Sequence, residues 1–233
     1  MHQPTRPLKN EILSALPKEV HSRLLPHLKP FEMRHSVVLY EMGQQVDYVY
    51  FPDNAVVSLV RQMLDGKIVE VGLVGNEGMT GLTALMGEDE TSPDRAIVQV
   101  ANGAARVELR VIKEEFLRGG LLQTLLLGYA RKLMQQISQT AACNASHTAE
   151  ERLSRWLLMC SDRVEGAELK LTQEFIAEML GTRRATVSLA AMVLQNDGLI
   201  EYNRGHIKII DRPGLEEFTC ECYQVTRDGK EGP

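Results

Sequence analysis

Two adjacent arginines, Arg183 and Arg184, stand at the expected start of a short helix within the stretch LTQEFIAEMLGTRRATVS, residues 171–188. An arginine side chain presents a planar fork of N–H donors that matches a guanine edge or a phosphate group. Cations at a helix N-terminus also oppose the helix dipole, at a cost of roughly 0.3–1 kcal/mol each. The pair therefore indicates contact with an anionic partner such as DNA, the alternative being an ordinary solvated helix end.

The residues around this pair predict a helix-turn-helix. Thr172 can cap a first helix, and Gly181 can end that helix because glycine adopts left-handed backbone without a Cβ clash. The second helix is expected from about Thr182 to Asn196. Its buried stripe is expected to hold Val187, Met192 and Val193. In such a motif the second helix enters the major groove of DNA.

A β-hairpin is predicted directly after the second helix. Leu199–Tyr202 and Ile207–Ile210 are β-rich runs, and Asn203–His206 between them has turn chemistry. A helix-turn-helix followed by a hairpin is a winged helix, whose wing can touch phosphates, although each polar residue of the turn taken singly also fits an ordinary exposed loop. The residues predicted to contact DNA are Thr172, Gln173, Arg183, Arg184, Thr186, Ser188, Arg204, His206 and Lys208.

Composition restricts the class of protein. A chain of 233 residues with 44% hydrophobic content has room for two domains with their own cores. No run approaches the roughly 18 apolar residues that cross a membrane, and MHQPTRPLKN lacks an apolar signal core, so we expect a cytoplasmic protein. The net charge of −5 disfavours a nonspecific nucleic-acid coater, so DNA binding needs a local basic face.

The N-terminal half predicts a helical lead-in followed by a β domain. Residues 8–28 have helical spacing, starting with Leu8 and interrupted by Pro17 and Pro26, and short β runs separated by glycine follow from Phe31 to Leu109. Asp65-Gly66 is a strong hairpin turn. The expected strands are Val37–Tyr40, Tyr48–Phe51, Val56–Val60, Ile68–Val71, Ala96–Val100 and Ala105–Leu109. Such spacing is typical of a sandwich or barrel.

Residues 113–145 predict a long helix with one narrow apolar seam. The seam residues advance by threes and fours and are Leu122, Leu126, Tyr129, Leu133, Ile137 and Thr140. A narrow seam favours a homodimer; the alternative is that it packs on its own β domain. Thr148 and Glu151 form a capping box that starts a new helix, Ala149–Arg163, after a domain boundary near Asn144–His147. That helix is expected to bury Leu153, Trp156, Leu157 and Cys160.

With this order of parts, residues 10–212 resemble the Crp/Fnr family of bacterial transcription regulators, most specifically at residues 171–188 and at NDGLI, residues 196–200. The resemblance implies an α+β chain. Its parts would be an antiparallel β-roll of the cyclic-nucleotide-binding type at 10–112, a dimerisation helix at 113–147, a winged helix-turn-helix at 148–212 and a C-terminal tail at 213–233. The family's base-reading positions correspond to Arg184, Ala185, Ser188 and Leu189. Because the family commonly has a glutamate and an arginine where this chain has Ala185 and Leu189, the operator sequence does not transfer.

The resemblance also locates an effector pocket, where this chain departs from cyclic-AMP-binding relatives. The pocket would include Gly81, Leu82, Thr83 and Arg95, and Leu82 stands where those relatives have a ribose-binding glutamate. The acidic stretch 88–94 lies between these residues. We therefore expect a degenerate pocket that does not bind cyclic AMP, with a cyclic-nucleotide-responsive regulator as the alternative.

Other sensor chemistries have weaker signals. An iron–sulfur cluster needs several thiolates, and no cysteine precedes Cys143. Haem would need an axial ligand, which His21, His27 or His35 could supply, although a lone histidine is usually structural or solvated. The spacing of Cys143, Cys160, Cys220 and Cys222 does not predict a zinc site. A redox effector remains open, with the last two cysteines expected to be exposed. No metal ligand or cofactor is assigned.

Nothing in the sequence combines a nucleophile with a base and an orienting acid, so we expect no enzyme and assign no catalytic residue. The expected function is a cytoplasmic, homodimeric transcription regulator whose partners are double-stranded promoter DNA, RNA polymerase and an unknown small-molecule or redox effector. A second hypothesis is a protein-interaction module without DNA binding, for which Arg183 and Arg184 would be dispensable.

Overall fold

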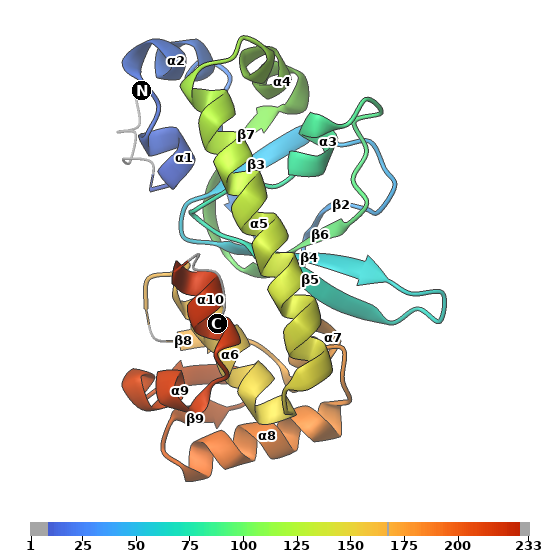
Figure 1. Cartoon of the computed structure of the whole chain (residues 1–233), viewed down its shortest axis with the longest axis vertical. Coiled ribbons are helices and arrows are strands. Elements are labelled where there is room, and N and C mark those ends of the chain that lie inside the picture. The colour runs from blue at the N-terminus through green and yellow to red at the C-terminus, as the bar shows by residue number, and fades with distance from the viewer. Residues whose placement is uncertain (1–8, 167, 229–233) are drawn as a thin grey trace. The chain divides into compact units, whose positions relative to one another are not determined.

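The computed structural model of the chain describes residues 9–166 and 168–228 (Figure 1). The chain divides into two compact units. The first comprises Met1–Val57 and Val74–Arg131, and the second comprises Ser58–Leu73 and Lys132–Pro233. Leu8 of the predicted lead-in, most of the N-terminal stretch used for the export prediction, and residues 229–233 of the predicted tail lie outside the described residues. No helix among the described residues has the length and apolar character needed to span a membrane.

The first unit opens with two short helices, α1 (Glu11–Ser14) and α2 (Lys18–Leu24), as the spacing of the lead-in predicts. The side chain of Asn10 caps α1 by accepting a hydrogen bond from the Leu13 amide at 3.2 Å. The same side chain donates to the Pro52 and Gly78 carbonyls. Asn10 thereby ties the lead-in to the β domain that follows.

A three-stranded antiparallel sheet in the first unit has the order β1-β7-β3, comprising β1 (Lys29–Met33), β3 (Tyr48–Pro52) and β7 (Asn102–Glu108). Strand β1 was not predicted, because KPFEM contains a proline and does not alternate. Tertiary contacts compensate: the Arg106 guanidinium on β7 lies 5.1 Å from the Phe31 ring centroid and 4.8 Å from that of Tyr48. One cation thus bridges rings from both outer strands.

A second antiparallel sheet has the order β2-β6-β4-β5, and the division between the two units runs through β4 and β5. The strands are β2 (Val38–Tyr40), β4 (Val56–Gln62), β5 (Ile68–Val74) and β6 (Arg95–Val100). The predicted Asp65-Gly66 turn joins β4 to β5. Gly66 has φ +83°, and the Met63 amide donates to the Lys67 carbonyl at 2.7 Å. The mixed helix and antiparallel-sheet class is confirmed.

The predicted long helix begins later than expected. Helix α3 (Leu82–Met86) is followed by β6, β7 and α4 (Leu109–Leu117), and the uninterrupted helix is α5 (Leu121–Ser146), visible along its length in Figure 1. The break before α5 coincides with Gly119 and Gly120, whose φ angles of +80° and +85° are left-handed. Two such residues in succession end an α-helix, so the helix expected from residue 113 is two helices.

The second unit contains the predicted winged helix-turn-helix. Its first helix, α6 (Ala149–Ser161), starts at the predicted capping box of Thr148 and Glu151, and the structure confirms both bonds of that box. The expected apolar side of α6 is buried, as predicted for Leu153, Trp156, Leu157 and Cys160. The remaining elements of the motif are β8 (Glu168–Lys170), α7 (Gln173–Met179), α8 (Arg184–Asn196), β9 (Ile200–Asn203) and β10 (His206–Ile209). The three strands form a sheet of order β8-β10-β9.

The predicted tail is largely part of the second unit's core. It contains α9 (Arg212–Phe218) and α10 (Cys222–Asp228), which pack on α6. Leu215 and Tyr223 are fully buried there, and the Tyr223 hydroxyl donates to an Asp162 carboxylate oxygen at 3.1 Å. The prediction that Cys220 and Cys222 are exposed is wrong, because both pack against Cys143 and Gln139 of α5 and are only 4% and 1% exposed.

A buried carboxyl group joins the β4–β5 hairpin to α6 within the second unit. The Trp156 indole N–H donates to Glu70 Oε1 at 2.9 Å, and Glu70 is buried. Burial disfavours the charged carboxylate and raises the pKa of Glu70 to about 7, although the hydrogen bonds from Ser58 and Trp156 act in the opposite direction. Glu70 is therefore protonated in the folded protein at acidic pH.

We expect the stability to fall as pH rises from 5 to 8 and the Glu70→Gln variant to lack most of this dependence. In the folded protein Glu70 holds its proton up to about pH 7, whereas the unfolded chain releases it near pH 4.5. Protonation of Glu70 therefore adds up to about 3 kcal/mol to the free energy of unfolding. This contribution is complete below the pKa of the unfolded chain and is lost as pH rises through the pKa of the folded protein. Urea unfolding across this range measures it, with exposed Glu32→Gln as the control. A Glu70→Gln profile that matches the wild type would contradict the expectation.

Candidate nucleic-acid interface

The turn between α7 and α8 fixes the direction of α8 relative to α7. Thr172 caps α7 by accepting a bond from the Phe175 amide at 3.2 Å. After α7, the Gly181 amide donates to the Glu178 carbonyl at 3.1 Å and the Thr182 amide to the Ala177 carbonyl at 2.9 Å, which is the Schellman pattern. Gly181 has φ +59°, as this pattern requires. The predicted cap and glycine stop are both confirmed.

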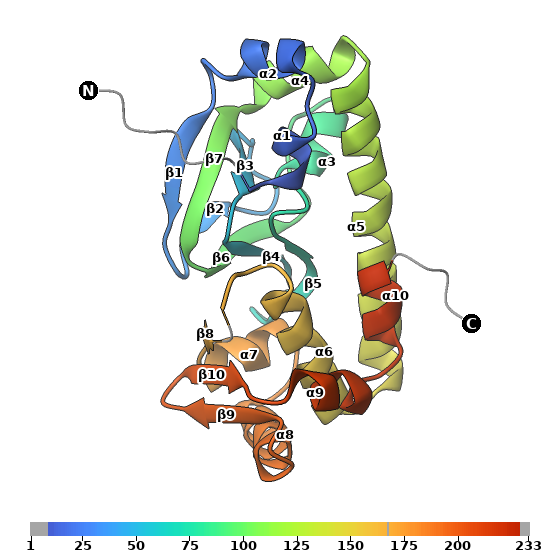
Figure 2. The same cartoon turned by 90° about the vertical axis from the view of Figure 1, so that its left-hand side faces the viewer.

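Helix α8 presents both arginines to solvent at its N-terminal end. Arg183 is the N-cap residue, without a side-chain capping bond, and Arg184 is the first helical residue. Both are exposed. The Arg184 Nε atom lies 3.8 Å from Glu174 Oε2, but both side chains are more than half exposed, so this pair is weak and easily exchanged for another anion. Figures 1 and 2 show α8 at the edge of its unit.

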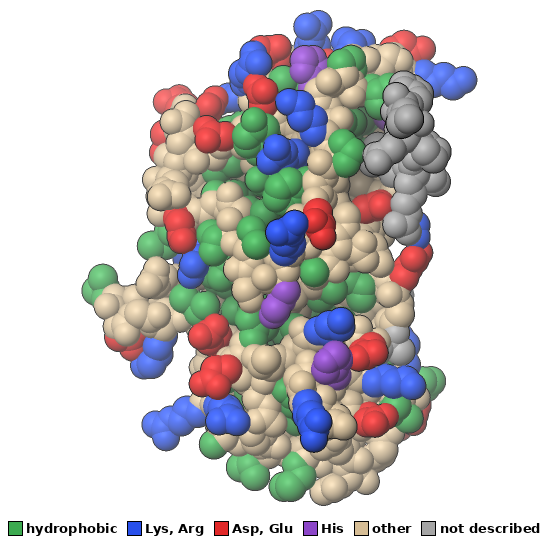
Figure 3. All heavy atoms as spheres, turned by 180° about the vertical axis from the view of Figure 1, so that it is seen from behind, with side chains coloured by type: hydrophobic (Ala, Val, Ile, Leu, Met, Phe, Trp, Pro, Cys, Tyr) green, Lys and Arg blue, Asp and Glu red, His purple; other side chains and the backbone are tan. Residues whose placement is uncertain are grey.

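The outward side of α8 is more apolar than the sequence suggested. Met192, expected in the buried stripe, is 49% exposed, because the buried residues follow the helical period through Val187, Ala190, Ala191 and Leu194. Leu189 is also exposed, at 58%. In Figure 3, which shows the molecule from behind, hydrophobic side chains emerge at the lower end, where α8 lies, and charges of both signs alternate above them. Exposed apolar groups on a recognition helix can contact thymine methyl groups.

Two predicted contact residues hold the helix-turn-helix together. The Ser188 hydroxyl on α8 donates to Gln173 Oε1 on α7 at 2.7 Å, and both residues are half-buried. The bond links the two helices of the motif directly. Ser188 therefore uses its hydroxyl proton inside the protein. Thr186, also predicted to contact DNA, is half-buried one turn from the arginines.

The wing forms as predicted, with a tighter turn. Strands β9 and β10 pair antiparallel, and the loop between them is only Arg204 and Gly205, both with positive φ, at +48° and +82°. Two positive φ values define the hairpin turn whose twist matches paired strands. Arg204 is exposed at the tip. A non-glycine residue in left-handed backbone is uncommon, so the turn holds this arginine at some conformational cost.

The two other predicted wing contacts face acidic neighbours. His206 Nδ1 lies 2.5 Å from Glu168 Oε1 on β8. Lys208 pairs in register with Glu201 on β9 and Glu168 on β8. These carboxylates reduce the local positive potential around His206 and Lys208.

A shallow pocket brings part of the predicted set together. It joins the start of α7, the start of α8 and the wing turn, and four of the predicted contacts line it. The lining residues are Thr172, Gln173, Glu174, Arg184, Tyr202, Arg204 and Gly205. The Tyr202 hydroxyl donates to the Leu171 carbonyl at 3.1 Å, which anchors β9 to the start of α7. Arg183, Thr186, Ser188, His206 and Lys208 do not line this pocket.

Most of the residues predicted to form the dimer seam pack within their own chain. Leu122, Leu126, Tyr129 and Leu133 are buried in the monomer, and Ile137 and Thr140 are half-buried. A Cβ atom on Gly78 would stand 2.1 Å from the Tyr129 ring, so Tyr129 packs closely on Gly78 within the first unit. Within the second unit, a Cβ atom on Gly72 would stand 3.4 Å from the side chains of Leu133 and Ile137. The apolar spacing of the seam therefore corresponds, at these positions, to packing within one chain.

A different face of α5 is open. Leu127 is 50% exposed and Met134 is 68% exposed, seven residues apart. The face continues with exposed residues at alternating intervals of four and three. Its members are Leu127, Arg131, Met134, Ser138, Ala141 and Ala145, and we call them the outer face of α5. This spacing is the heptad pattern of a helix that pairs with another helix. This second pattern is also present in the sequence. It was not predicted because the seam residues, most of them one position earlier in the chain, form a more strongly apolar pattern.

Several residues of the predicted effector pocket already have partners within the chain. Leu82 is buried at the start of α3, and Gly81 has φ +75° with its amide bonded to the Tyr40 hydroxyl at 2.9 Å. Arg95 forms an ion pair with Glu41 at 3.0 Å. Thr83 is exposed, and its hydroxyl lies 3.5 Å from that of Ser92. A phosphate would have to displace Glu41 from the one cation among the predicted pocket residues.

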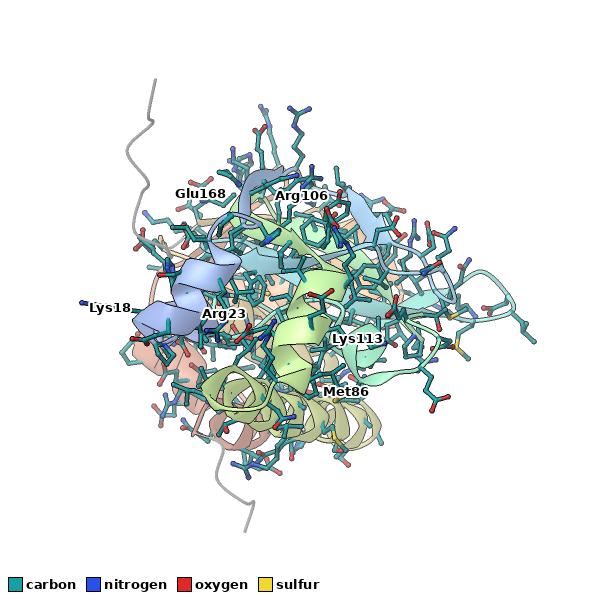
Figure 4. The ribbon with its side chains drawn as sticks, turned by 90° about the horizontal axis from the view of Figure 1, so that it is seen from above. Lys18, Arg23, Met86, Arg106, Lys113 and Glu168 are labelled. Carbon is teal, nitrogen blue, oxygen red and sulfur yellow. The ribbon has the colours of Figure 1, made fainter. Side chains whose placement is uncertain are left out.

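The acidic stretch 88–94 is held by the helix that follows the β domain. Lys113 on α4 forms an ion pair with Glu90 at 2.9 Å and donates to the Gly87 carbonyl at 3.1 Å. Elsewhere on the same helix, Glu115 of α4 binds Arg23 of α2 at 2.5 Å. Figure 4 shows the labelled Arg23 and Lys113 at α2 and α4. These cations are therefore engaged by carboxylates.

Comparison with known proteins finds a family match for one segment of the second unit. Residues 151–218 match the family described as the Crp-like helix-turn-helix domain. No curated protein sequence matches the chain. Solved structures match over most of its length. FixK2 from Bradyrhizobium japonicum has 17% identity and a TM-score of 0.70, with 83% of this chain and 98% of that chain covered.

Two further structures have the same fold. A CRP-family transcriptional regulator from Thermus thermophilus has 20% identity and a TM-score of 0.66, with 82% and 95% of the two chains covered. The regulator CLP from Xanthomonas campestris, described as c-di-GMP-responsive, has 17% identity and a TM-score of 0.66, with 84% and 100% covered. At these identities the matches establish a shared fold. They do not transfer the effector or the operator of a matched protein to this chain.

Proposed function

We propose, for a chain that carries a Crp-like helix-turn-helix domain and has the fold of the Crp/Fnr transcription regulators, that it binds specific promoter sites as a cytoplasmic homodimer and regulates transcription there. The observation that carries this proposal is the placement of Arg183 and Arg184. Both stand exposed at the N-terminal end of α8, on a capped and hydrogen-bonded helix-turn-helix, beside the exposed wing arginine. Two cations at a helix N-terminus oppose the helix dipole, so the stability of α8 alone does not explain why they stand there.

In the complex, the N-terminal end of α8 enters the major groove. Arg184 exchanges its weak pair with Glu174 for a guanine edge or a phosphate, and Arg204 contacts the sugar–phosphate backbone from the wing. The apolar Leu189 faces the groove further along the helix, where a thymine methyl group is the matching partner. Specificity then combines a guanine contact with an apolar contact, while the cations supply most of the salt-dependent affinity.

A homodimer forms through the outer face of α5 in this proposal. Two copies related by a two-fold axis bring Leu127 to Leu127 or Met134 to Met134, and the small residues Ser138, Ala141 and Ala145 allow close helix approach. A two-fold dimer presents two α8 helices to DNA, which suits half-sites about 34 Å apart. RNA polymerase is the partner through which a bound dimer would act.

Selection from a random duplex library tests this function. The protein is incubated with duplexes at about 0.15 M salt, and bound sequences are amplified and sequenced. We expect an inverted repeat whose half-sites are centred about 10–10.5 base pairs apart, or a multiple of that spacing. A library that gains no common sequence after repeated rounds would overturn DNA recognition and favour a protein-interaction module. A common sequence without two-fold symmetry would overturn the dimeric arrangement.

We also propose that the β-roll does not respond to cyclic AMP, because Leu82 is buried at the expected ribose position and Arg95 is paired with Glu41. Cyclic AMP at a millimolar concentration should leave both the melting temperature and the affinity for the selected site unchanged. A ligand at 100 times its dissociation constant would stabilise the fold by about 2.7 kcal/mol, so binding would be visible in a thermal melt. A rise in melting temperature with cyclic AMP but not with AMP would support the cyclic-nucleotide-responsive alternative.

A further inference from the structure

The fold gathers four metal-binding side chains that lie far apart in the sequence. Cys143 and His147 are on α5 and its C-terminal end, one helical turn apart, and Cys220 and Cys222 lie at the start of α10. Their sulfur and imidazole nitrogen atoms all lie within 4.8 Å of one another. The three cysteines are buried, and the His147 side chain is 16% exposed. All four belong to the second unit.

The spacing of the ligand atoms fits one tetrahedral ion. Cys143 Sγ lies 3.6 Å from Cys220 Sγ, and Cys222 Sγ lies 3.6 Å from His147 Nδ1. With Zn–S near 2.3 Å and Zn–N near 2.0 Å, tetrahedral geometry places neighbouring ligand atoms about 3.5–3.8 Å apart. An iron–sulfur cluster would need more room, because its ligands bind separate irons. Magnesium and calcium prefer oxygen ligands, which this set does not supply.

Groups around the four ligands orient them as a metal site requires. His147 Nε2 lies 3.2 Å from Glu221 Oε2, so the carboxylate orients the imidazole and leaves Nδ1 directed toward the sulfur atoms. A carboxylate on the remote ring nitrogen is the usual second partner of a metal-bound histidine. The Gln139 amide donates to Cys222 Sγ at 3.0 Å, a bond that stabilises a thiolate.

A buried cation offsets the charge of such a site. Three thiolates and one divalent ion leave a net charge of −1, and Arg155 on α6 interacts electrostatically with Cys143. The guanidinium of Arg155 donates to Thr140 on α5 and Thr226 on α10, at 3.1 and 3.2 Å. It is only 5% exposed, the two groups to which it donates are neutral hydroxyls, and another electrostatic partner is the Glu70 carboxyl group, whose pKa is raised to about 7. An anionic metal–thiolate centre gives this buried positive charge a counterpart.

We propose that Cys143, His147, Cys220 and Cys222 bind one zinc ion. Three cysteines and a histidine complete the coordination shell and leave no open position, so the ion is structural rather than catalytic. It joins the last turn of α5 to the start of α10, directly before the capping box from which α6 begins. The zinc therefore fixes the junction between α5 and α6, which carries the helix-turn-helix. This inference does not depend on DNA binding.

Metal analysis of the full chain is the first test. Protein purified under reducing conditions, exposed to excess Zn²⁺ and desalted should retain about one zinc per chain by mass spectrometry. Replacement by Co²⁺ should produce the intense visible bands of tetrahedral cobalt and a sulfur-to-metal charge-transfer band. Zinc below about one tenth per chain, or the weak spectrum of octahedral cobalt with oxygen ligands, would overturn the proposal. So would a Cys143–Cys220 disulfide in protein prepared without oxidant, because that bond consumes two ligands.

Matched variants locate the ion. Cys222→Ser should lose at least tenfold in retained zinc, and Cys160→Ala should retain it, because Cys160 is an equally buried cysteine outside the cluster. His147→Cys should keep the ion, since four thiolates also bind zinc tetrahedrally, and should shift the cobalt charge-transfer band by adding a sulfur ligand. The result expected for His147→Cys is retained metal with a changed cobalt spectrum. This variant therefore tests the assignment even if Cys222→Ser does not fold. Equal zinc retention in Cys222→Ser and Cys160→Ala, or an unchanged cobalt spectrum in His147→Cys, would refute the assignment.

Discussion

Replacing both Arg183 and Arg184 with alanine is expected to weaken binding to the selected promoter site by about 2–6 kcal/mol, because each arginine that contacts a base edge or phosphate contributes about 1–3 kcal/mol. The fold should survive, because both side chains are exposed and neither caps α8 through its side chain. Removing two cations from the helix N-terminus should even favour the helix slightly. Fluorescence anisotropy on a labelled duplex at several salt concentrations measures both the affinity and its salt dependence.

The matched control is Arg34→Ala combined with Arg110→Ala. These arginines are also exposed, and their loss changes the net charge by the same amount, but they lie in the first unit. If local contacts dominate, this control should stay within about threefold of the wild type, since distant charges are screened at 0.15 M salt. An affinity and a salt slope that are the same in both double variants would exclude α8 as the reading helix.

A single conservative change separates charge from geometry at the same place. Arg184→Lys keeps the positive charge but loses the planar fork that binds guanine through two hydrogen bonds. If Arg184 reads a guanine, this variant should keep most of its nonspecific affinity and lose about 1–3 kcal/mol of preference for the selected site. A contact to phosphate alone would leave that preference intact.

Replacing Leu127 and Met134 with glutamate is expected to convert the dimer to monomers. Both side chains are at least half exposed in the monomer, so the substitutions should leave the fold intact while placing like charges across a two-fold interface. A monomer binds one half-site at a time, and the loss of the linked second contact should weaken binding to the full site by a factor of about 10²–10⁴. Sedimentation or light scattering gives the mass, and anisotropy gives the affinity.

Two comparisons test the assignment of faces on α5. Leu25→Glu, at another half-exposed leucine just after α2, should remain dimeric. Leu126→Ala, in the buried seam, should instead lower the free energy of unfolding by about 2–5 kcal/mol, because it leaves a cavity within the monomer. A dimer that dissociates with Leu126→Ala and persists in the double glutamate variant would restore the seam predicted from the sequence.

Local signals explain why the winged helix could be predicted closely. The Thr172 cap, the Gly181 stop and the box of Thr148 and Glu151 each depend on residues within about four positions, and all formed as expected. Caps and tight turns satisfy backbone groups that have no other partner, so their residue types carry strong information. Where the prediction missed an element, as with β1, the local signal was weak and the pairing partner lay about 70 residues away.

The sequence by itself determined the order of the parts, the capped helices and turns of the DNA-binding motif and the two exposed arginines, because these follow from neighbours along the chain. Only the tertiary structure decided which face of α5 is buried, since Leu126 and Leu127 are adjacent and the β domain selects between them. The grouping of Cys143 and His147 with Cys220 and Cys222 is likewise tertiary. No spacing rule joins residues about 75 positions apart, and these meet because α10 folds back along α5.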